Sequence, residues 1–386
     1  MGSYPPIEHL ERSMERRRQT VPDNLRPFTE AKRDMPRACL LIGQRGVGKT
    51  TFLLHHASEK NLLYLSADNP LLADRPLYET VNGVFMQGYS GVILDEVHFA
   101  RDWSLHLKAL YDDFPEHTIW ASDSSSMVLR SGVADLSRRF VTIQMPLLSF
   151  REFIKLKTGV EPPTFNPFFN ESMEVGPKFL ALFREYRKIG TRPFFREGSF
   201  AERMMGILKK VLHSDVPFFL PRITDGNLRL MSAIVGTLAK SPVPRLQVRS
   251  LCADWHIGAE KLYQLLFVME SVGLIRIIRK TNETKANTVG DKMFFGDPVY
   301  YDILGGNVGT AREALVAAMI AEAGHTIEAH GDETCGDFVI DISDTEMKVE
   351  VGGKNKKQKK ADFVVRDDTD VPTGRTIPLW SLGCLY

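Results

Sequence analysis

The segment Gly43–Thr50 constrains the fold of this chain more than any other. It reads G-Q-R-G-V-G-K-T and matches the pattern G-x-x-x-x-G-K-T. The apolar stretch Ala38–Ile42 before it is an expected strand, and Thr50–Ala57 after it is an expected helix. In that setting a glycine-rich turn surrounds phosphate groups with backbone N–H groups and the positive end of a helix. We therefore predict a phosphate-binding loop that holds a nucleotide. The predicted nucleotide contacts are Gly43, Gln44, Arg45, Gly46, Val47, Gly48, Lys49, Thr50 and Thr51.

A second motif, Gly91–Glu96, supplies two acids at the end of an apolar strand. Ligands of open α/β sheets bind beyond the carboxyl ends of the strands, so these acids should face the loop. We predict that Lys49 reaches the β- and γ-phosphates of ATP, and that the Thr50 hydroxyl and Asp95 hold Mg²⁺. Glu96 is the predicted catalytic base, which polarises the attacking water.

Further apolar stretches predict a parallel sheet. Asn61–Asp68 lies between the loop and the carboxylate strand, and Thr118–Ala121 follows that strand. Helical patterns separate these stretches, which is typical of strand–helix repeats with both sheet faces covered. The order favours the P-loop ATPases with an additional strand over simple kinases and GTPases.

Two groups of polar residues are candidates for the rest of an ATPase site. Ser122, Asp123 and Ser124 follow the next strand, where a polar side chain can sense the γ-phosphate, and the choice among them stays open. Arg138 and Arg139 precede the following strand. In ring-forming ATPases that position supplies an arginine finger to the neighbouring subunit, and a surface salt bridge is the alternative.

The runs GQRGVGKTTFL, VILDEVHFARDW, ASDSSS, SRRF and PLLSFREF occur in this order along the chain. They resemble a group of bacterial and archaeal AAA-plus ATPases whose C-terminal half is a domain of unknown function, with a winged helix and a restriction-endonuclease-like fold. The resemblance is strongest over residues 36–155. It implies nucleotide hydrolysis and says little about biological role, for which DNA processing, mobile elements and defence have been suggested among relatives.

The expected architecture is α/β, with a P-loop domain followed by further segments. The predicted segments are an N-terminal helical arm (1–30), an AAA-plus ATPase domain (31–150), a helical lid (151–240), a winged helix (241–290) and an α/β nuclease-like domain (291–386). Ile7–Gln19 should form the helix of the arm, packed on the next domain or on a neighbouring subunit. Ile377–Leu382 is the last expected strand.

The predicted winged helix is a candidate DNA contact. Its second helix, Ala259–Val272, should bury an apolar stripe of Leu262, Leu265, Leu266, Met269 and Val272. Its opposite face has no arginine to read guanine. Four cations of the wing could contact phosphates instead: Arg276, Arg279, Lys280 and Lys285. We predict sequence-independent DNA contact, with a structural winged helix that packs subunits as the alternative.

The last segment contains the acids of a restriction-type nuclease. Asp337 and Glu350 lie on neighbouring expected strands, with Glu313 on the preceding helix as a third Mg²⁺ ligand. The lysine that such sites place two residues after the second acid is replaced by Gly352. Lys354, Lys356 or Gln358 could approach instead from the following loop and helix. The other interpretation is a domain that binds DNA or a partner through the run Lys354–Lys360 without cutting.

Composition limits the partners. Net charge is +1 over 386 residues, so no broad basic field predicts nucleic acid binding, and local patches would have to provide it. No apolar run is long enough to span a bilayer, which favours a cytoplasmic protein without membrane contact. We expect an ATPase that forms a homo-oligomer, with a hexameric ring as one form, and that acts on DNA. The alternatives are an ATP-powered nuclease and a nucleotide-controlled switch for protein partners.

Overall fold

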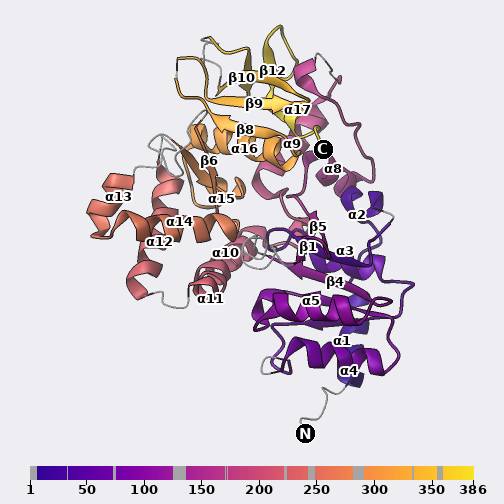
Figure 1. Ribbon diagram of the computed structural model, residues 1–386. Helices are drawn as coiled ribbons and strands as arrows, with labels where there is room; N and C mark the ends of the chain where they lie inside the picture. The colour runs from indigo at the N-terminus through magenta and orange to yellow at the C-terminus, as the bar shows by residue number, and fades with distance from the viewer. Residues whose placement is uncertain are drawn as a thin grey trace. The chain divides into compact units, whose positions relative to one another are not determined.

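The computed structural model divides the chain into two compact units, Met1–Met145 and Pro146–Tyr386 (Figure 1). The residues that it describes are 7–32, 34–72, 75–124, 136–169, 171, 173–220, 224–241, 248–280, 291–332, 334–353 and 360–386. Each unit has its own sheet, so each is described by itself.

The first unit contains a five-stranded parallel sheet, as the sequence predicts. Its strands are β1 (Ala38–Ile42), β2 (Leu62–Ser66), β3 (Gly91–Asp95), β4 (Thr118–Asp123) and β5 (Val141–Gln144), in the order β2-β3-β4-β1-β5. Although β2 separates β1 from β3 in the sequence, β4 separates them in the sheet. The carboxyl ends of β1, β3 and β4 are therefore neighbours.

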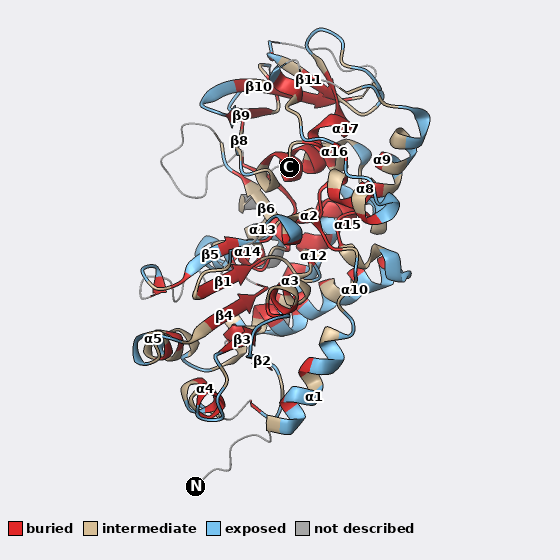
Figure 2. Cartoon of the chain, turned by 90° about the vertical axis from the view of Figure 1, so that its right-hand side faces the viewer, coloured by how far each residue is buried: buried red, intermediate tan, exposed pale blue. Residues whose placement is uncertain are grey.

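Helices flank this sheet, and its strands β1 to β4 are buried, whereas the edge strand β5 is mostly exposed (Figure 2). The helices of the first unit are α1 (Ile7–Arg18), α2 (Pro27–Ala31), α3 (Lys49–His56), α4 (Leu77–Met86), the 3-10 turn η1 (Val97–Phe99) and α5 (Trp103–Asp113). Leu10 and Met14 lie one helical turn apart in α1 and are both buried. Arg18 donates to the Ala57 carbonyl at 3.1 Å. The arm thus packs on its own unit, next to β2 and α3.

The second unit begins with helices and ends with a mixed sheet. Its helices are α8 (Phe150–Thr158), η2 (Pro167–Phe169), α9 (Pro177–Ile189), η3 (Pro193–Glu197), α10 (Phe200–Lys210), the π-helix η4 (Val211–Asp215), α11 (Val216–Phe219), α12 (Asp225–Lys240), α13 (Val248–Trp255), α14 (Ala259–Ser271), α15 (Val299–Ile303), α16 (Val308–Glu322) and α17 (Leu379–Leu382). One hydrophobic core runs through it, from Leu148 to Cys384. The stripe predicted on α14 belongs to this core, because Leu262, Leu265 and Met269 are buried.

The strands of the second unit form a hairpin and a five-stranded sheet. They are β6 (Ile275–Ile278), β7 (Lys292–Phe295), β8 (Thr326–Ala329), β9 (Phe338–Ile342), β10 (Thr345–Gly352), β11 (Phe363–Arg366) and β12 (Thr376–Pro378). β6 pairs with β7, and the larger sheet has the order β12-β11-β10-β9-β8. The predicted boundary at residue 290 falls between the two strands of the hairpin. The assignment of α13, α14 and this hairpin as a winged helix stays a prediction.

One expected strand is partly wrong. Ile377–Leu382 was expected to be a strand throughout, but β12 ends at Pro378 and Leu379–Leu382 is the helix α17. All four residues of α17 are buried. A short apolar run that is buried on every side has no period that separates a strand from a helix.

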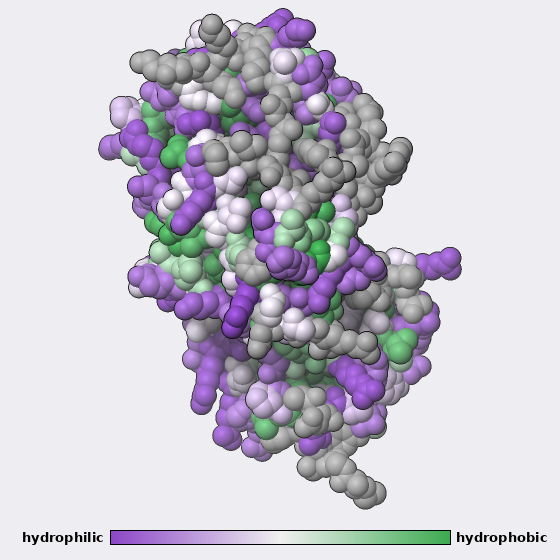
Figure 3. All heavy atoms as spheres, turned by 90° about the vertical axis from the view of Figure 1, so that its left-hand side faces the viewer, coloured by the Kyte–Doolittle hydropathy of each residue, from purple (hydrophilic) through white to green (hydrophobic). Residues whose placement is uncertain are grey.

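The surface is mostly hydrophilic on the face drawn in Figure 3, with small apolar patches between polar side chains. Large exposed apolar side chains such as Met86, Val160 and Val371 lie far apart in the sequence. Within the described ranges, no helix has the length and apolar character needed to cross a membrane.

Candidate active site

The turn after β1 has the shape that its glycines allow. Gly46 and Gly48 have φ angles of 78° and 106°, where a side chain would be strained. A Cβ atom on Gly43 would lie 2.6 Å from the Met145 carbonyl oxygen. α3 begins at Lys49, so the first N–H groups of this helix face the turn. The loop and helix therefore form the phosphate cradle that the sequence motif requires.

Lys49 lies against the loop itself. Its Nζ donates to the carbonyl oxygens of Gly43 at 2.7 Å and Gln44 at 3.3 Å. Burial lowers the pKa of Lys49, and the nearby carboxylates of Glu96 and Asp95 act in the opposite direction. The ammonium group is thus held at the cradle, among acids.

Asp95 is a buried acid surrounded by hydroxyl groups. Its Oδ2 accepts hydrogen bonds from Thr50 Oγ1 and Tyr64 Oη, each at 2.7 Å, and its Oδ1 accepts one from Ser122 Oγ at 2.5 Å. These donors fix the orientation of the Asp95 carboxylate. The structure thus brings Thr50 and Asp95 together, although they come from α3 and β3. A hydroxyl and a carboxylate are oxygen ligands of the kind that Mg²⁺ prefers, so the donor set fits that ion.

Glu96 follows Asp95 with a φ angle of 51°, which turns its side chain away from the strand direction. Its Oε1 accepts from Arg45 Nη1 at 3.1 Å, and its Oε2 accepts from Ser124 Oγ at 2.9 Å. Burial raises the pKa of Glu96, while the positive charges of Lys49 and Arg45 lower it. A carboxylate with a raised pKa is a stronger base, which suits the role predicted for Glu96.

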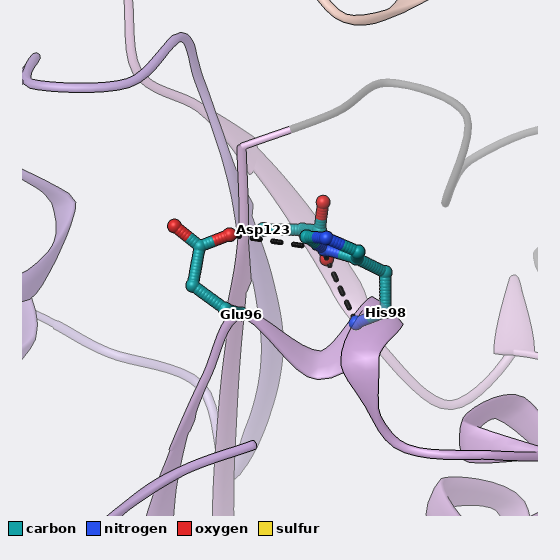
Figure 4. A group of neighbouring side chains, drawn as sticks. All are labelled: Glu96, His98 and Asp123. Carbon is teal, nitrogen blue, oxygen red and sulfur yellow. Dashed lines mark hydrogen bonds and ion pairs between the residues drawn. The ribbon is translucent and has the colours of Figure 1, made fainter. Parts of the chain in front are cut away.

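His98 and Asp123 form a fully buried pair beside Glu96 (Figure 4). The Asp123 Oδ2 accepts from the His98 backbone N–H at 3.0 Å and lies 2.7 Å from the His98 Nδ1. Because the carboxylate is an acceptor, we assign the proton to Nδ1. The same Nδ1 lies 3.7 Å from Glu96 Oε2. The three side chains are close enough to share a metal ion, with ligand atoms within 4.8 Å, but the hydrogen bonds already account for their proximity.

The polar residues at the end of β4 and just after it have three different partners. Ser122 contacts Asp95, Asp123 contacts His98, and Ser124 contacts Glu96. The sequence left open which residue senses the γ-phosphate. The structure gives each of them a different acidic or basic neighbour in the site, and the sensing role stays a prediction.

The two candidate finger arginines differ in their surroundings. Arg139 makes two hydrogen bonds to Asp112, from Nε to Oδ1 at 2.8 Å and from Nη2 to Oδ2 at 2.9 Å. This contact lowers the pKa of Asp112. Arg138 is exposed. Arg139 therefore forms the surface salt bridge of the alternative, whereas Arg138 is an exposed side chain.

Sequence reasoning missed three residues of this site, which are Tyr64, His98 and Arg26. Arg26 is buried and donates from Nη1 to the Val47 carbonyl within the loop, at 2.8 Å. The Arg17 guanidinium lies over the Tyr64 ring, 4.8 Å from its centroid. The only sequence signal for Tyr64 is a hydroxyl within the apolar run of β2.

The nuclease-like acids of the second unit meet a lysine that the sequence did not suggest. Lys292 of β7 contacts Glu313 Oε2 at 2.6 Å and Asp337 Oδ1 at 3.0 Å. Asp337 also accepts from the Val351 N–H at 2.9 Å, and the neighbouring Glu350 is fully buried. Within the described part of the chain, the three carboxylates do not all come within 4.8 Å of one another.

Several predicted DNA contacts have other neighbours or lie outside the described residues. Arg276 pairs with Glu322, and Arg279 Nη2 lies 3.3 Å from Glu270 Oε2. The backbone N–H of Lys280 donates to Asp291 at 3.0 Å. Lys285 and residues 354–359 are outside the described ranges, whereas Lys360 is exposed.

Residues 35–154 match an AAA domain family, and therefore form an AAA-type P-loop domain. The uncharacterized protein MJ1637 of Methanocaldococcus jannaschii is 30% identical over 273 residues, which cover 63% of this chain and 56% of the relative. The chain thus spans little more than half the length of that relative. The α/β class and parallel sheet expected from the sequence are confirmed for this domain.

Solved structures show weaker likeness. The Walker-type ATPase PABY2304 of Pyrococcus abyssi is 15% identical, with 79% of this chain and 99% of that chain covered and a TM-score of 0.42. The Holliday junction branch migration motor RuvB of Thermotoga maritima is also 15% identical, with coverages of 79% and 98% and a TM-score of 0.36.

Proposed function

We propose that this chain hydrolyses ATP with Mg²⁺ as its cofactor. One observation carries the proposal: Thr50 Oγ1 and Asp95 Oδ2 lie 2.7 Å apart beside the phosphate loop, with Glu96 adjacent. The two proposed oxygen ligands for Mg²⁺ and the proposed base for water thus lie together beyond the carboxyl ends of β1 and β3, where α/β sheets bind ligands.

Nucleotide binding would use the loop and its cations. The N–H groups of residues 43–51 would bind the phosphates, and Lys49 would exchange its loop carbonyls for β- and γ-phosphate oxygens. Thr50 and Asp95 would hold Mg²⁺, which neutralises charge on the phosphates. Tyr64 and Ser122 keep Asp95 oriented through their hydrogen bonds.

Hydrolysis would then depend on Glu96. Its carboxylate accepts a proton from the attacking water while the water oxygen bonds to the γ-phosphorus. The bond between that phosphorus and the β–γ bridging oxygen breaks, and ADP leaves. Ser124 and the His98–Asp123 pair hold Glu96 and its surroundings in place.

Phosphate release by Glu96→Gln and Lys49→Ala tests this proposal. Glu96→Gln should bind ATP but lose most turnover, because an amide does not accept the proton. Lys49→Ala should weaken ATP binding. Glu116→Gln is the matched control, since Glu116 is exposed. Full turnover by Glu96→Gln would refute the assignment of the base.

We further propose that the chain assembles and that Arg138 acts on a neighbouring subunit. The exposed position of this arginine supports the proposal. Arg138→Ala and Glu96→Gln should each be inactive alone. A mixture of the two variants should regain activity, because an Arg138→Ala subunit keeps Glu96 and can receive Arg138 from a neighbouring Glu96→Gln subunit. No recovery in mixed assemblies would refute action across subunits.

Coupling of hydrolysis to DNA is a separate proposal, based on the wing and the lysine run in the sequence. The rate of ATP turnover should then rise when DNA is added. This stimulation should fall steeply as the salt concentration increases. Turnover that ignores single-stranded, duplex and branched DNA would favour a switch for protein partners.

Metal-dependent DNA cleavage is the second candidate function. The contacts of Lys292 with Glu313 and Asp337 favour it, because they place a lysine beside the acids although residue 352 is glycine. Cleavage in the presence of Mg²⁺ and ATP that disappears in Asp337→Ala, Glu350→Ala and Lys292→Ala would establish it. DNA that stays intact in the wild type under these conditions would refute it.

A further inference from the structure

Arg45 joins the phosphate loop to the proposed catalytic base. It is the third residue of the loop, and its Nη1 lies 3.1 Å from Glu96 Oε1. Both side chains are mostly buried, each with 13% of its surface exposed. The pair is therefore shielded from solvent, unlike an ordinary surface salt bridge.

The position of Glu96 determines what else Arg45 can reach. A base that takes a proton from the attacking water lies within one hydrogen bond of that water, and the water attacks the γ-phosphorus. A guanidinium that touches Glu96 is consequently adjacent to the place of the γ-phosphate. Because Arg45 belongs to the loop that wraps the phosphates, a change of side-chain conformation is enough to bring it to the γ-phosphate oxygens.

Charge favours such a change. A terminal phosphate carries about two negative charges near neutral pH, and a carboxylate carries one. Arginine also binds phosphate through two parallel N–H groups, which a planar guanidinium provides better than an ammonium group. ADP lacks the γ-phosphate and offers Arg45 no equivalent partner at this place.

We propose that Arg45 is a catalytic residue that exchanges Glu96 for the γ-phosphate of a bound nucleoside triphosphate. This inference rests on the proposed ATPase function and deepens it. The exchange has two consequences. Arg45 stabilises the charge that develops on the transferred phosphoryl group, and Glu96 Oε1 becomes available to the attacking water. Arg45 thus distinguishes ATP from ADP within one subunit, whereas Arg138 would act across subunits.

The ratio of two affinities tests the exchange. Dissociation constants for the β,γ-imido analogue of ATP and for ADP, both with Mg²⁺, should be measured calorimetrically for the wild type and Arg45→Gln. Arg45→Gln should weaken binding of the analogue about tenfold and leave that of ADP within about twofold. Its kcat should fall by at least about tenfold, since it loses a transition-state contact. The control is Arg101→Gln, because the Arg101 side chain is 97% exposed.

Breaking the ion pair from its other side gives an independent measurement. Glu96→Gln replaces the carboxylate with a weaker partner for Arg45, so it should tighten binding of the analogue and leave ADP binding unchanged. Arg45→Lys keeps the positive charge but loses the bidentate contact of the guanidinium with phosphate. Its affinity for the analogue should therefore lie between those of the wild type and Arg45→Gln. Loss of ADP binding would reveal that Arg45→Gln fails to fold. In that case, Glu96→Gln and Arg45→Lys test the exchange.

The exchange is refuted if substitution of Arg45 changes the affinities for the analogue and ADP by the same factor. It is also refuted if Glu96→Gln shifts both affinities equally. These outcomes are distinct from failure of the proposed function, which would appear as a wild type without turnover or a Glu96→Gln variant with full turnover. A wild type that turns over ATP, combined with equal affinity changes, would reject the role of Arg45 alone.

Discussion

The hydroxyl of Tyr64 donates a hydrogen bond to the Asp95 carboxylate at 2.7 Å. It links β2 at one edge of the sheet to the proposed Mg²⁺ ligand at the end of β3. The Arg17 guanidinium lies over the same ring, so the N-terminal helix contacts the residue that orients Asp95. Tyr64 is therefore a positioning residue for the metal site.

Tyr64→Phe should raise the Mg²⁺ concentration needed for half-maximal ATP hydrolysis by a few-fold. Asp95 keeps its contacts with Thr50 and Ser122 but loses one donor that orients it. The unfolding free energy should fall by about 1 kcal/mol, the typical net value of one hydrogen bond. Tyr78→Phe is a matched control, because Tyr78 donates to Asp113 at 2.7 Å on the surface. Equal Mg²⁺ requirements in both variants would contradict a positioning role for Tyr64.

His98→Phe should lower kcat between about 10- and 100-fold, with little change in nucleotide affinity. The substitution removes a side-chain donor that holds the buried Asp123 carboxylate beside Glu96. His98→Asn can restore a donor near the place of Nδ1 and should recover part of kcat. Single-turnover rates and equilibrium ATP affinities separate the two effects. A loss of affinity with an unchanged chemical rate would show that His98 serves binding instead.

The sequence predicted the parts of this site that are contiguous. The glycine-rich turn and the Asp95–Glu96 pair are each a short run whose spacing alone places them at the carboxyl ends of strands. The parallel sheet followed from the alternation of strands and helices. Each of these predictions needed only local pattern and one general rule about sheets.

Contacts between distant elements could not be predicted in this way. Lys292 contacts Asp337, although the two residues are 45 positions apart in the sequence. Lys292 lies in β7, a strand that is recognised by its antiparallel pairing with β6. Tyr64 looks like any core residue of an apolar strand until β2 and β3 are paired. Arg45 occupies a variable position of the loop motif, so its contact with Glu96 depends on side-chain conformation, which the motif does not specify.

As pH decreases, the rate of ATP hydrolysis should begin to fall at pH values at which an exposed glutamate is still ionised. Burial raises the pKa of Glu96 above its ordinary value of 4.5, and the base acts only when it is deprotonated. The effect of pH on folding stability has the opposite direction. Because the pKa of Glu96 is raised in the folded chain, this group stabilises the folded chain at low pH, and the contribution is lost as pH rises through the folded-state pKa. The measurement is kcat against pH, with ATP affinity followed at each pH. A profile that falls only below pH 4.5 would contradict the raised pKa.

Arg192→Met should strongly destabilise the chain, by about 3–5 kcal/mol, because it leaves a buried charge on Asp297. Arg192 Nη1 lies 2.7 Å from Asp297 Oδ2, and Thr191 donates to the same oxygen at 2.9 Å. Only 2% of the Arg192 side chain and none of that of Asp297 is exposed. This ion pair joins the residue that precedes η3 to the turn between β7 and α15.

A matched surface pair and a double substitution separate the buried charge from lost packing. Arg203 pairs with Glu197 at 2.8 Å, with 46% and 58% of the side chains exposed, so Arg203→Met should cost less than about 1 kcal/mol. Adding Asp297→Leu to Arg192→Met removes the uncompensated charge, and should recover part of the lost stability. Urea unfolding followed by circular dichroism measures all of these variants. If the double variant were no more stable than Arg192→Met alone, lost packing around Arg192 would explain the destabilisation instead.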